Sequence, residues 1–252
     1  MPKKRKKKKS NPALLWRCAA ALAAAVALIA GLALLLTPRE KEPEPTEPTV
    51  LQEKIPGIDV SSHQGQIDWE KVADSGVQFA IVRLGYRSYG DGTLHTDQRA
   101  KENLEGARAA GLKVGAYFFS QALNEAEAET EAALALGILG DFELDLPLAY
   151  DWEYVSEEAR TADLEPEQLV KCVRAFCETV ENGGEEPMVY FNQDLANTRL
   201  DLSEIEEYPF WLAQYAESLD FPQAVAFWQH SDQGKIDGIE ENVDLNWYWP
   251  KA

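Results

Sequence analysis

Strand-like and helix-like segments alternate along the chain from residue 57, and this alternation restricts the fold more than any other feature. The strand-like segments are short and apolar, and they span residues 57–61, 79–86, 113–120, 147–153 and 187–192. The segments between them have helical spacing or composition and cover residues 68–75, 96–110, 124–139 and 165–181. Alternation of this kind predicts parallel strands with helices packed outside them.

The rhythm changes in the last part of the chain. Three further strand-like segments, 210–215, 225–231 and 243–248, follow one another with little helical pattern between them. Five strands from the alternating part, which is five βα units or nearly so, and three plain strands give eight strands, the number that closes a barrel of this kind. The sequence therefore predicts an α/β fold, a TIM-like barrel of the (β/α)5(β)3 type, over residues 55–252. Cys172 and Cys177 fall on the helix predicted over 165–181, where we expect them to be small core residues.

The N-terminus combines a basic block with a long apolar run. Lys and Arg fill positions 3–9, and the 19 residues from Cys18 to Leu36 carry no charged side chain. As a helix this run rises about 28 Å, close to the ~30 Å hydrocarbon core of a bilayer, and a basic flank stays on the cytoplasmic side. We therefore expect a basic cytoplasmic tail over residues 1–13 and one transmembrane helix within residues 14–37.

A cleaved signal peptide is the alternative interpretation of this segment. We favour a retained anchor, because the apolar run exceeds the ~7–15 residues usual in signal peptides and no small-x-small cleavage motif follows it. Residues 38–54 are rich in Pro and Glu, a composition typical of an extended, disordered linker. The expected location is the cell membrane, with a single pass and the folded domain outside the cell.

Charge is divided unevenly between the two parts of the chain. Residues 55–252 hold 38 of the 43 acidic residues but only 13 of the 24 Lys and Arg residues. A domain with so strong an acidic excess is repelled by nucleic acid, which excludes DNA or RNA as a partner. We expect the domain to work as a monomer.

Four acidic residues stand at the ends of predicted strands, where barrels of this type place their active sites. They are Asp59, Asp151, Glu153 and Asp244. Side chains alternate along a strand, so Asp151 and Glu153 share one face, with Cα atoms about 6.6–6.8 Å apart. Two carboxyls this close repel when both are ionised, and one pKa rises. An acid beside an anionic carboxylate is the arrangement that hydrolysis of a glycosidic bond requires.

Aromatic residues on or beside the predicted strands are a second indication of a sugar substrate. Aromatic rings stack on the apolar faces of sugars, and their polar ends can bond hydroxyl groups. Core packing is the other explanation for many of them. Gln229, Asn192 and Asn246 are side chains that could bond a sugar amide. The aromatic set comprises Tyr86, Tyr117, Phe119, Tyr190, Trp211, Tyr215, Trp228 and Trp247.

Several short motifs in this order resemble the family 25 glycoside hydrolases, the muramidases often called Chalaropsis-type lysozymes. The resemblance covers roughly residues 55–250, and it depends on the order and spacing of the motifs rather than on any one of them. The motifs are Gly57-Ile58-Asp59-Val60-Ser61, Ile67-Asp68-Trp69, the segment 111–118 (GLKVGAYF), Asp151-Trp152-Glu153, the segment 210–215 (FWLAQY), Trp228-Gln229-His230 and Val243-Asp244-Leu245-Asn246.

The resemblance implies cleavage of the β-1,4 bond between N-acetylmuramic acid and N-acetylglucosamine in peptidoglycan, without a cofactor. It implies Glu153 as the proton donor and Asp151 as the group that stabilises the transition state or orients the acetamido group, with Asp59 and Asp244 completing an acidic cluster. It also implies sugar-binding roles for Tyr117, Tyr190, Trp211 and Gln229. One segment departs from the family pattern: residues 83–87 (RLGYR) stand where many relatives carry a Lys-Ala-Thr-Glu-Gly type segment.

Three other functions fit parts of the same sequence. A family 18 chitinase-like hydrolase also ends a strand in Asp-x-Glu, but two upstream acids of its pattern are replaced here by Leu146 and Ala149. A catalytically inactive barrel could bind wall glycan, although all four expected carboxylates are present. A metal-dependent hydrolase is the third, and the histidines, His63, His95 and His230, are not paired at zinc-ligand spacing. We therefore expect no metal. Whether the reaction retains or inverts configuration stays open.

Overall fold

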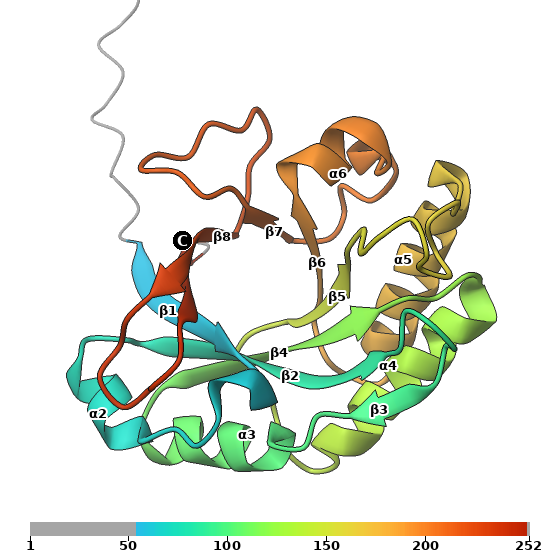
Figure 1. The fold of residues 1–252 in the computed structure, drawn as a ribbon. Helices are drawn as coiled ribbons and strands as arrows, with labels where there is room; N and C mark the ends of the chain where they lie inside the picture. The colour runs from blue at the N-terminus through green and yellow to red at the C-terminus, as the bar shows by residue number, and fades with distance from the viewer. Residues whose placement is uncertain (1–53, 251–252) are drawn as a thin grey trace, which may run out of the picture. The chain divides into compact units, whose positions relative to one another are not determined.

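The computed structural model describes residues 54–250, which form a single ring of strands with helices outside it (Figure 1). The segments predicted as tail, anchor and all but the last residue of the linker (1–13, 14–37 and 38–54) lie outside the described residues. Among residues 54–250, no helix has the length and apolar character needed to cross a bilayer.

Eight strands close the barrel in the order β1-β9-β8-β7-β6-β5-β4-β2, and β1 pairs with β2 to complete the ring. This confirms the predicted eight-stranded α/β barrel. The strands are β1 (Ile55–Val60), β2 (Phe79–Arg87), β4 (Lys113–Ser120), β5 (Leu148–Trp152), β6 (Pro187–Asn192), β7 (Phe210–Ala213), β8 (Phe227–Gly234) and β9 (Val243–Tyr248).

The last strand is the exception to parallel order. β9 runs antiparallel to both of its neighbours, β8 and β1, whereas the other pairings around the ring are parallel. The start of β9 therefore lies at the same end of the barrel as the carboxyl ends of the other strands. Although Asp244 is the second residue of its strand, this direction places it at the same end of the barrel as Asp59, near the carboxyl end of β1.

Part of the outer face of the ring, but not the side formed by β7, β8 and β9, carries the helices α2 (Trp69–Asp74), α3 (Ala100–Ala109), α4 (Glu125–Leu139) and α5 (Pro166–Asn182) (Figure 1). The prediction of one helix over 96–110 was wrong at its start. Residues Leu94–Thr96 form an additional short strand, β3, which pairs antiparallel with Gly85–Arg87 of β2. Gly85 permits this pairing, because a Cβ there would lie 2.4 Å from the backbone oxygen of His95.

Short helical turns that the sequence pattern does not indicate lie after β1 and between β6 and β7. They are η1 (Ser62–Gln64), α6 (Gln193–Thr198) and η2 (Leu202–Glu204). Asn192, one of the side chains considered for a sugar amide, caps α6 instead by accepting a hydrogen bond from the Leu195 N–H at 2.8 Å. Capping of this kind satisfies a donor that the first helical turn leaves unpaired.

Two apolar layers hold the barrel together, one on each face of the sheet. Inside the ring, Phe79, Met188, Trp211 and Phe227 belong to one buried cluster. Outside it, the strand residues that point the other way pack against the helices, and both Cys172 and Cys177 are fully buried in this second cluster. The prediction that these cysteines are core residues is confirmed.

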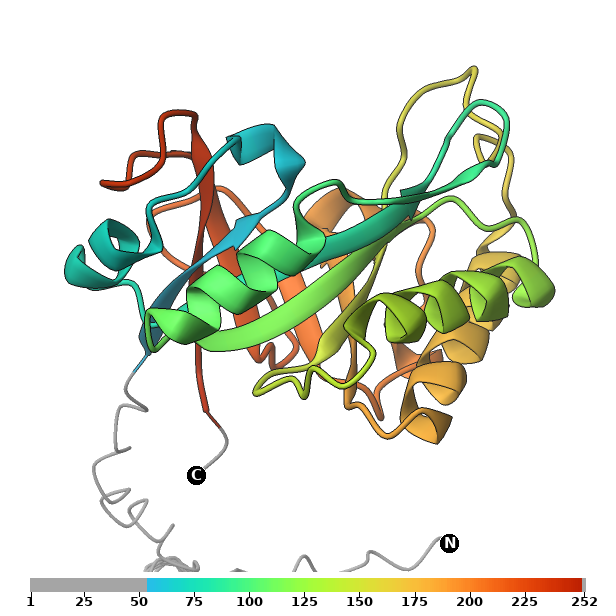
Figure 2. The same ribbon diagram turned by 90° about the horizontal axis from the view of Figure 1, so that it is seen from below.

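The loops at one end of the barrel define a mouth. The segments after β1, β2 and β5 extend together at this end, whereas the described chain enters β1 and leaves β9 at the opposite end (Figure 2). In a barrel of this kind the carboxyl ends of the strands carry the reactive groups, and this end is where the predicted acids lie.

Candidate active site

A hollow of about 220 Å³ lies in the mouth of the barrel and gathers all eight residues predicted for the site. Four are the acids Asp59, Asp151, Glu153 and Asp244, and four are Tyr117, Tyr190, Trp211 and Gln229. Three further side chains, Arg83, Phe119 and Tyr215, complete the wall. All eight strands of the ring, together with residues shortly after β5 and β7, supply these eleven side chains.

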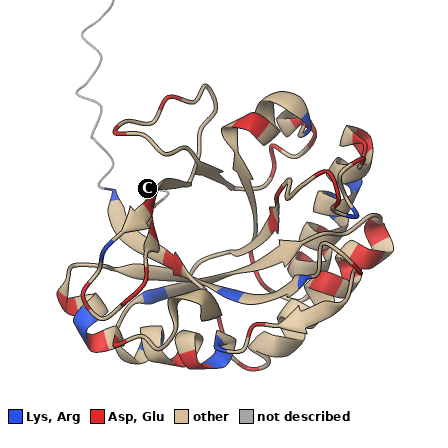
Figure 3. Cartoon of the chain, in the orientation of Figure 1, with Lys and Arg blue, Asp and Glu red and all other residues tan. Residues whose placement is uncertain are grey.

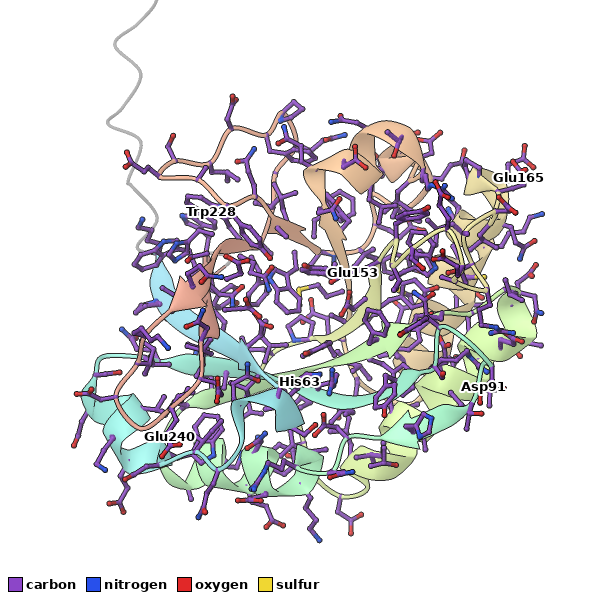
Figure 4. All side chains as sticks on the ribbon, viewed as in Figure 1. His63, Asp91, Glu153, Glu165, Trp228 and Glu240 are labelled. Carbon is purple, nitrogen blue, oxygen red and sulfur yellow. The ribbon has the colours of Figure 1, made fainter. Side chains whose placement is uncertain are left out.

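Strand β5 positions the Asp-x-Glu pair as the alternation of side chains requires. Asp151 is 5% exposed and Glu153, the residue directly after the strand, is half-buried, and both line the hollow. Trp152 between them points outward into the core beneath the helices. Gln121 fixes the strand end by donating a hydrogen bond to the Glu153 backbone oxygen at 3.0 Å. Figure 4 shows Glu153 within the ring of strands, with Trp228 set apart from it.

Asp59 is held by two amide side chains from the closing strands. Its Oδ2 accepts hydrogen bonds from Gln229 Nε2 at 2.9 Å and from Asn246 Nδ2 at 2.8 Å. The amide oxygens are oriented in turn: Gln229 Oε1 accepts from Tyr190 and Tyr215, and Asn246 Oδ1 accepts from Trp211 Nε1 at 2.8 Å. Donors to a carboxylate favour its charged form, so this network stabilises an anion at Asp59.

Asp244 lies opposite Asp59 in the β1–β9 register, and the two carboxyls interact directly. Burial raises the pKa of Asp59 to about 6, with the Gln229 and Asn246 hydrogen bonds acting against the rise. Burial and then the charge of Asp59 raise the pKa of Asp244 to about 8. Because the amide donors stabilise the charge on Asp59, the proton that this pair shares belongs on Asp244.

The Asp151 and Glu153 carboxyls are also shifted towards their protonated forms. Burial, followed by the charges of Glu153 and Asp59, raises the pKa of Asp151 well above its usual value, while Arg83 acts against it. Burial raises the pKa of Glu153, whereas a hydrogen bond from Tyr190 lowers it. The Tyr190 hydroxyl has one proton and faces two acceptors, Glu153 and Gln229. The site can therefore keep an acid proton near neutral pH.

One oxygen of the acidic pair lacks a protein partner. Asp151 Oδ1 is buried without a hydrogen bond among residues 54–250. A buried acceptor of this kind costs about 1–3 kcal/mol unless something bonds it. Since Asp151 lines the hollow, a donor group on a bound substrate can satisfy this oxygen.

Aromatic rings form the wall around the acids. Trp211 contacts Tyr190 edge-on with ring centroids 4.8 Å apart, and Tyr117 with centroids 6.0 Å apart. Tyr215 is 56% exposed at the rim and offers an open ring face. Trp228 and Trp247 do not line the hollow: Trp228 donates to the Gln214 backbone oxygen and stacks on Trp249, and Trp247 stacks on His230.

Two parts of the site were not evident from the sequence pattern. Asn246 was considered a partner for a sugar amide, but its amide is buried and holds Asp59. Gln229 lines the hollow, yet its amide is likewise bonded to Asp59 and two tyrosines. The sequence pattern does not predict that Arg83 lines the hollow; the signal it offers is the departure of residues 83–87 from the family pattern.

Among the described residues, no group of three His, Cys, Asp or Glu side chains is arranged to hold a metal ion.

Comparison with known proteins agrees with this geometry. The family description "Glycosyl hydrolases family 25" matches residues 58–239. The Escherichia coli K12 protein YegX is 34% identical over 76% of this chain and 68% of its own length. An autolytic lysozyme of Clostridium acetobutylicum is 29% identical over 75% of this chain and 54% of its own.

A solved structure shares the fold. The modular autolysin LytC from Streptococcus pneumoniae superimposes with a TM-score of 0.67 at 30% identity, covering 78% of this chain. The chain spans about half the length of LytC, 47%. The family match covers more than half of the sequence and includes Asp59, strand β5 and the pair Asp151 and Glu153. The chain therefore belongs to glycosyl hydrolases family 25 and is a glycoside hydrolase.

Proposed function

We propose that this protein is a muramidase, which cleaves the β-1,4 bond between N-acetylmuramic acid and N-acetylglucosamine in peptidoglycan. The observation that carries the proposal is the position of Glu153 beside Asp151 at the mouth of the barrel, with both pKa values raised. The names of similar proteins support the substrate: one is an autolytic lysozyme, and LytC has been solved with a synthetic peptidoglycan ligand.

Glu153 is the proton donor in this proposal. Its proton passes to the glycosidic oxygen as the bond from that oxygen to C1 of the muramic acid breaks. Water then adds its hydroxyl group to C1, and its remaining proton goes to one of the two carboxylates, Glu153 or Asp151. The half-buried position of Glu153 suits this role, because the carboxyl faces the hollow and keeps its proton.

Asp151 assists at the other side of the reacting carbon. Positive charge develops on the sugar ring in the transition state. This charge, like that of Arg83, favours the ionised form of Asp151, whose carboxylate then stabilises it. The unpaired Oδ1 is also placed to accept a hydrogen bond from the N–H of a substrate acetamido group, which would orient that group. Either action needs Asp151 buried and aimed into the hollow, as it is.

Asp59 and Asp244 maintain the electrostatic balance of the hollow. The charges of Asp59 and Asp244 raise the pKa of Asp151, and the charge of Asp244 raises the pKa of Glu153. A proton held between Asp59 and Asp244 removes one of these charges and so limits the rise. The wall formed by Tyr117, Tyr190 and Trp211, with Gln229, would contact the sugar on either side of the bond.

The location of the enzyme is part of the proposal. Residues 14–37 have the length and composition of a single membrane anchor, and residues 38–54 those of a linker. The described chain enters β1 at the end of the barrel opposite the mouth (Figure 2).

Mass spectrometry of the digestion products tests the cleaved bond. Purified peptidoglycan is digested, reduced with borohydride and analysed for its new reducing ends. Reduced N-acetylmuramic acid is the expected product. A reduced N-acetylglucosamine end would contradict the muramidase assignment, and no soluble product at all would favour a wall-binding protein without activity.

A further inference from the structure

A second and larger hollow adjoins the catalytic one. It measures about 620 Å³, within the range of small-ligand sites. It lies between η1, the β2–β3 hairpin and the loop after β5. Arg83 and Phe119 line both hollows, so the two are neighbours at the same mouth. His63 lies on η1, the short turn directly after β1, and lines one side of this second hollow (Figure 4).

The lining of this second hollow differs in charge from the rest of the domain. Twelve residues of the described chain line it, and none of them is Asp or Glu. Acidic side chains recur elsewhere, notably along α4 (Figure 3), and four acids line the catalytic hollow. The basic side chains here are Arg83, Arg87, His63 and His95. A negatively charged ligand would meet less repulsion here than in the catalytic hollow.

Arg83 is the cation that faces this space. Its Nε donates to Asp97 Oδ2 at 2.9 Å and its Nη2 lies 3.4 Å from the Ser62 hydroxyl, while Nη1 has no hydrogen-bond partner among residues 54–250. Asp97 is fully buried and fixes the guanidinium from behind. The Arg87 guanidinium is not free, because Glu131, Gly92 and Glu127 accept its hydrogen bonds. A fixed guanidinium with an open donor is suited to a carboxylate.

A bulge in β2 aims Arg83 and Tyr86 at the same space. Arg83 pairs with Tyr117 and Tyr86 pairs with Phe119, but the register shifts by one residue between Arg83 and Gly85. Without this extra residue, side chains three positions apart would point to opposite faces. The Arg83 guanidinium instead lies 5.3 Å from the centre of the Tyr86 ring.

The rim of the hollow offers apolar contact. Tyr86 stacks on His95 with ring centroids 4.7 Å apart. Tyr89, which is 54% exposed, and Val155, which is 38% exposed, stand at the edge. A ligand that fits these features has negative groups together with small apolar side chains.

On the basis of the proposed muramidase function, we propose that this second hollow binds the acidic peptide carried by the lactyl group of N-acetylmuramic acid. The peptide is the part of peptidoglycan that combines free carboxylates with alanine methyl groups, whereas N-acetylglucosamine is neutral. Arg83 would bond a carboxylate of the peptide through Nη1, and the rim residues would contact its methyl groups. Adjacent hollows then receive the glycan strand and its peptide branch together.

The test inserts a negative charge into the second hollow. Gln98 is exposed and lines this hollow only, so Gln98→Glu adds one charge with almost no change of shape. Gln66→Glu is the matched control, because Gln66 is also exposed, lies shortly before a helix and lines neither hollow. The substrates are uncrosslinked glycan strands that carry the peptide and the same strands after an amidase has removed it.

The measured quantity is the ratio of kcat/KM on peptide-bearing strands to kcat/KM on stripped strands. We expect Gln98→Glu to lower this ratio about five-fold through charge repulsion, Gln98→Lys to raise it, and Gln66→Glu to leave it unchanged. An unchanged ratio in both Gln98 variants would overturn the proposal. Equal losses on both substrates would also overturn it, because the hollow would then recognise the lactyl carboxylate or a sugar.

These outcomes are separate from a failure of the proposed function. If the wild-type protein releases reducing ends from neither substrate, the muramidase proposal fails before the ratio can be formed. If it releases them from both, only the peptide assignment is at stake. Thermal unfolding of each variant confirms that the exposed substitutions leave the fold intact.

Discussion

Asp244 faces Asp59 directly across the antiparallel pairing of β9 with β1, and the two carboxyls share a proton. Two acids in contact are usually a cost to a folded protein unless one is neutral. The Gln229 and Asn246 amides decide which one is charged, because both donate to Asp59. This pair therefore makes stability depend on pH in a defined direction.

Replacing Asp244 with Asn should stabilise the protein at high pH. Both carboxyls have folded pKa values, about 6 and about 8, above their usual 3.8. The folded state thus holds protons that the unfolded state has lost, and stability falls as pH rises from about 4 to 8. Asn mimics the protonated acid, so we expect Asp244→Asn to raise the Tm by a few degrees at pH 8 and to change it little at pH 4. A Tm difference that does not vary with pH would contradict the shared proton.

Replacing Glu153 with Gln should abolish turnover while leaving the fold intact. Gln keeps the shape of the side chain but cannot donate an acid proton, and general acid catalysis contributes about 10²–10⁴-fold to rate. We expect kcat on peptidoglycan to fall by at least ~10²-fold with an unchanged Tm. Glu157→Gln makes the same substitution at an exposed position in the same loop and should stay within about two-fold of wild type. Activity retained in Glu153→Gln would remove Glu153 from its role.

Replacing Tyr190 with Phe should shift the pH profile upward. The Tyr190 hydroxyl favours the charged form of Glu153 and so lowers its pKa. Loss of the hydroxyl raises that pKa, and the acid stays protonated to a higher pH. The alkaline limb of kcat/KM against pH is expected to move up in pH, since this limb reports deprotonation of the acid. Tyr208→Phe, which alters a buried tyrosine outside the hollow, should leave the limb in place. A downward shift in Tyr190→Phe would contradict the assignment.

Replacing Arg87 with Leu should destabilise the barrel strongly. Arg87 Nε pairs with Glu131 at 2.5 Å, and the Glu131 side chain is fully buried. Removing one partner of a buried pair costs about 3–5 kcal/mol, because the other charge is left without compensation. Burial already raises the Glu131 pKa to about 7, and loss of Arg87 raises it further.

The cost of Arg87→Leu relative to wild type should therefore grow above about pH 7, because Glu131 ionises there in folded wild type but must still hold its proton in the folded variant. Urea unfolding at pH 5 and pH 8 measures this difference. Lys101→Leu is the matched control, since the Lys101–Glu105 pair is exposed and 3.7 Å apart. An exposed pair contributes about 0–1 kcal/mol. Equal losses in the free energy of unfolding in the two variants would mean that the buried Arg87–Glu131 pair stabilises the fold no more than an exposed pair.

The parallel part of the barrel was predictable because its signals are local. The strands of the βα units are short apolar runs, and the helices between them have turn residues at their ends, as with Gly111 after α3 at a φ of 84°. The strand over 94–96 was missed because three residues carry too little periodicity to be distinguished from a helix start. Its formation depends on the partner strand β2, which lies outside any local window.

The Asp-x-Glu pair was also determined locally, because alternation along one strand places Asp151 and Glu153 on one face whatever surrounds them. The roles of Gln229 and Asn246 were not. Their amides could have served a sugar as well as a carboxylate, and only the packing of β8 and β9 against β1 directs them to Asp59.

The eight strands of the ring, the acids near their ends and the side chains that share a face could be predicted from the sequence, since each follows from residue type and a two-residue period. The tertiary structure alone decided that β9 runs antiparallel, which sets Asp244 against Asp59, and that a bulge turns Arg83 and Tyr86 to one side. Both depend on how distant strands register with one another, and register is an energy of the whole ring rather than of any segment.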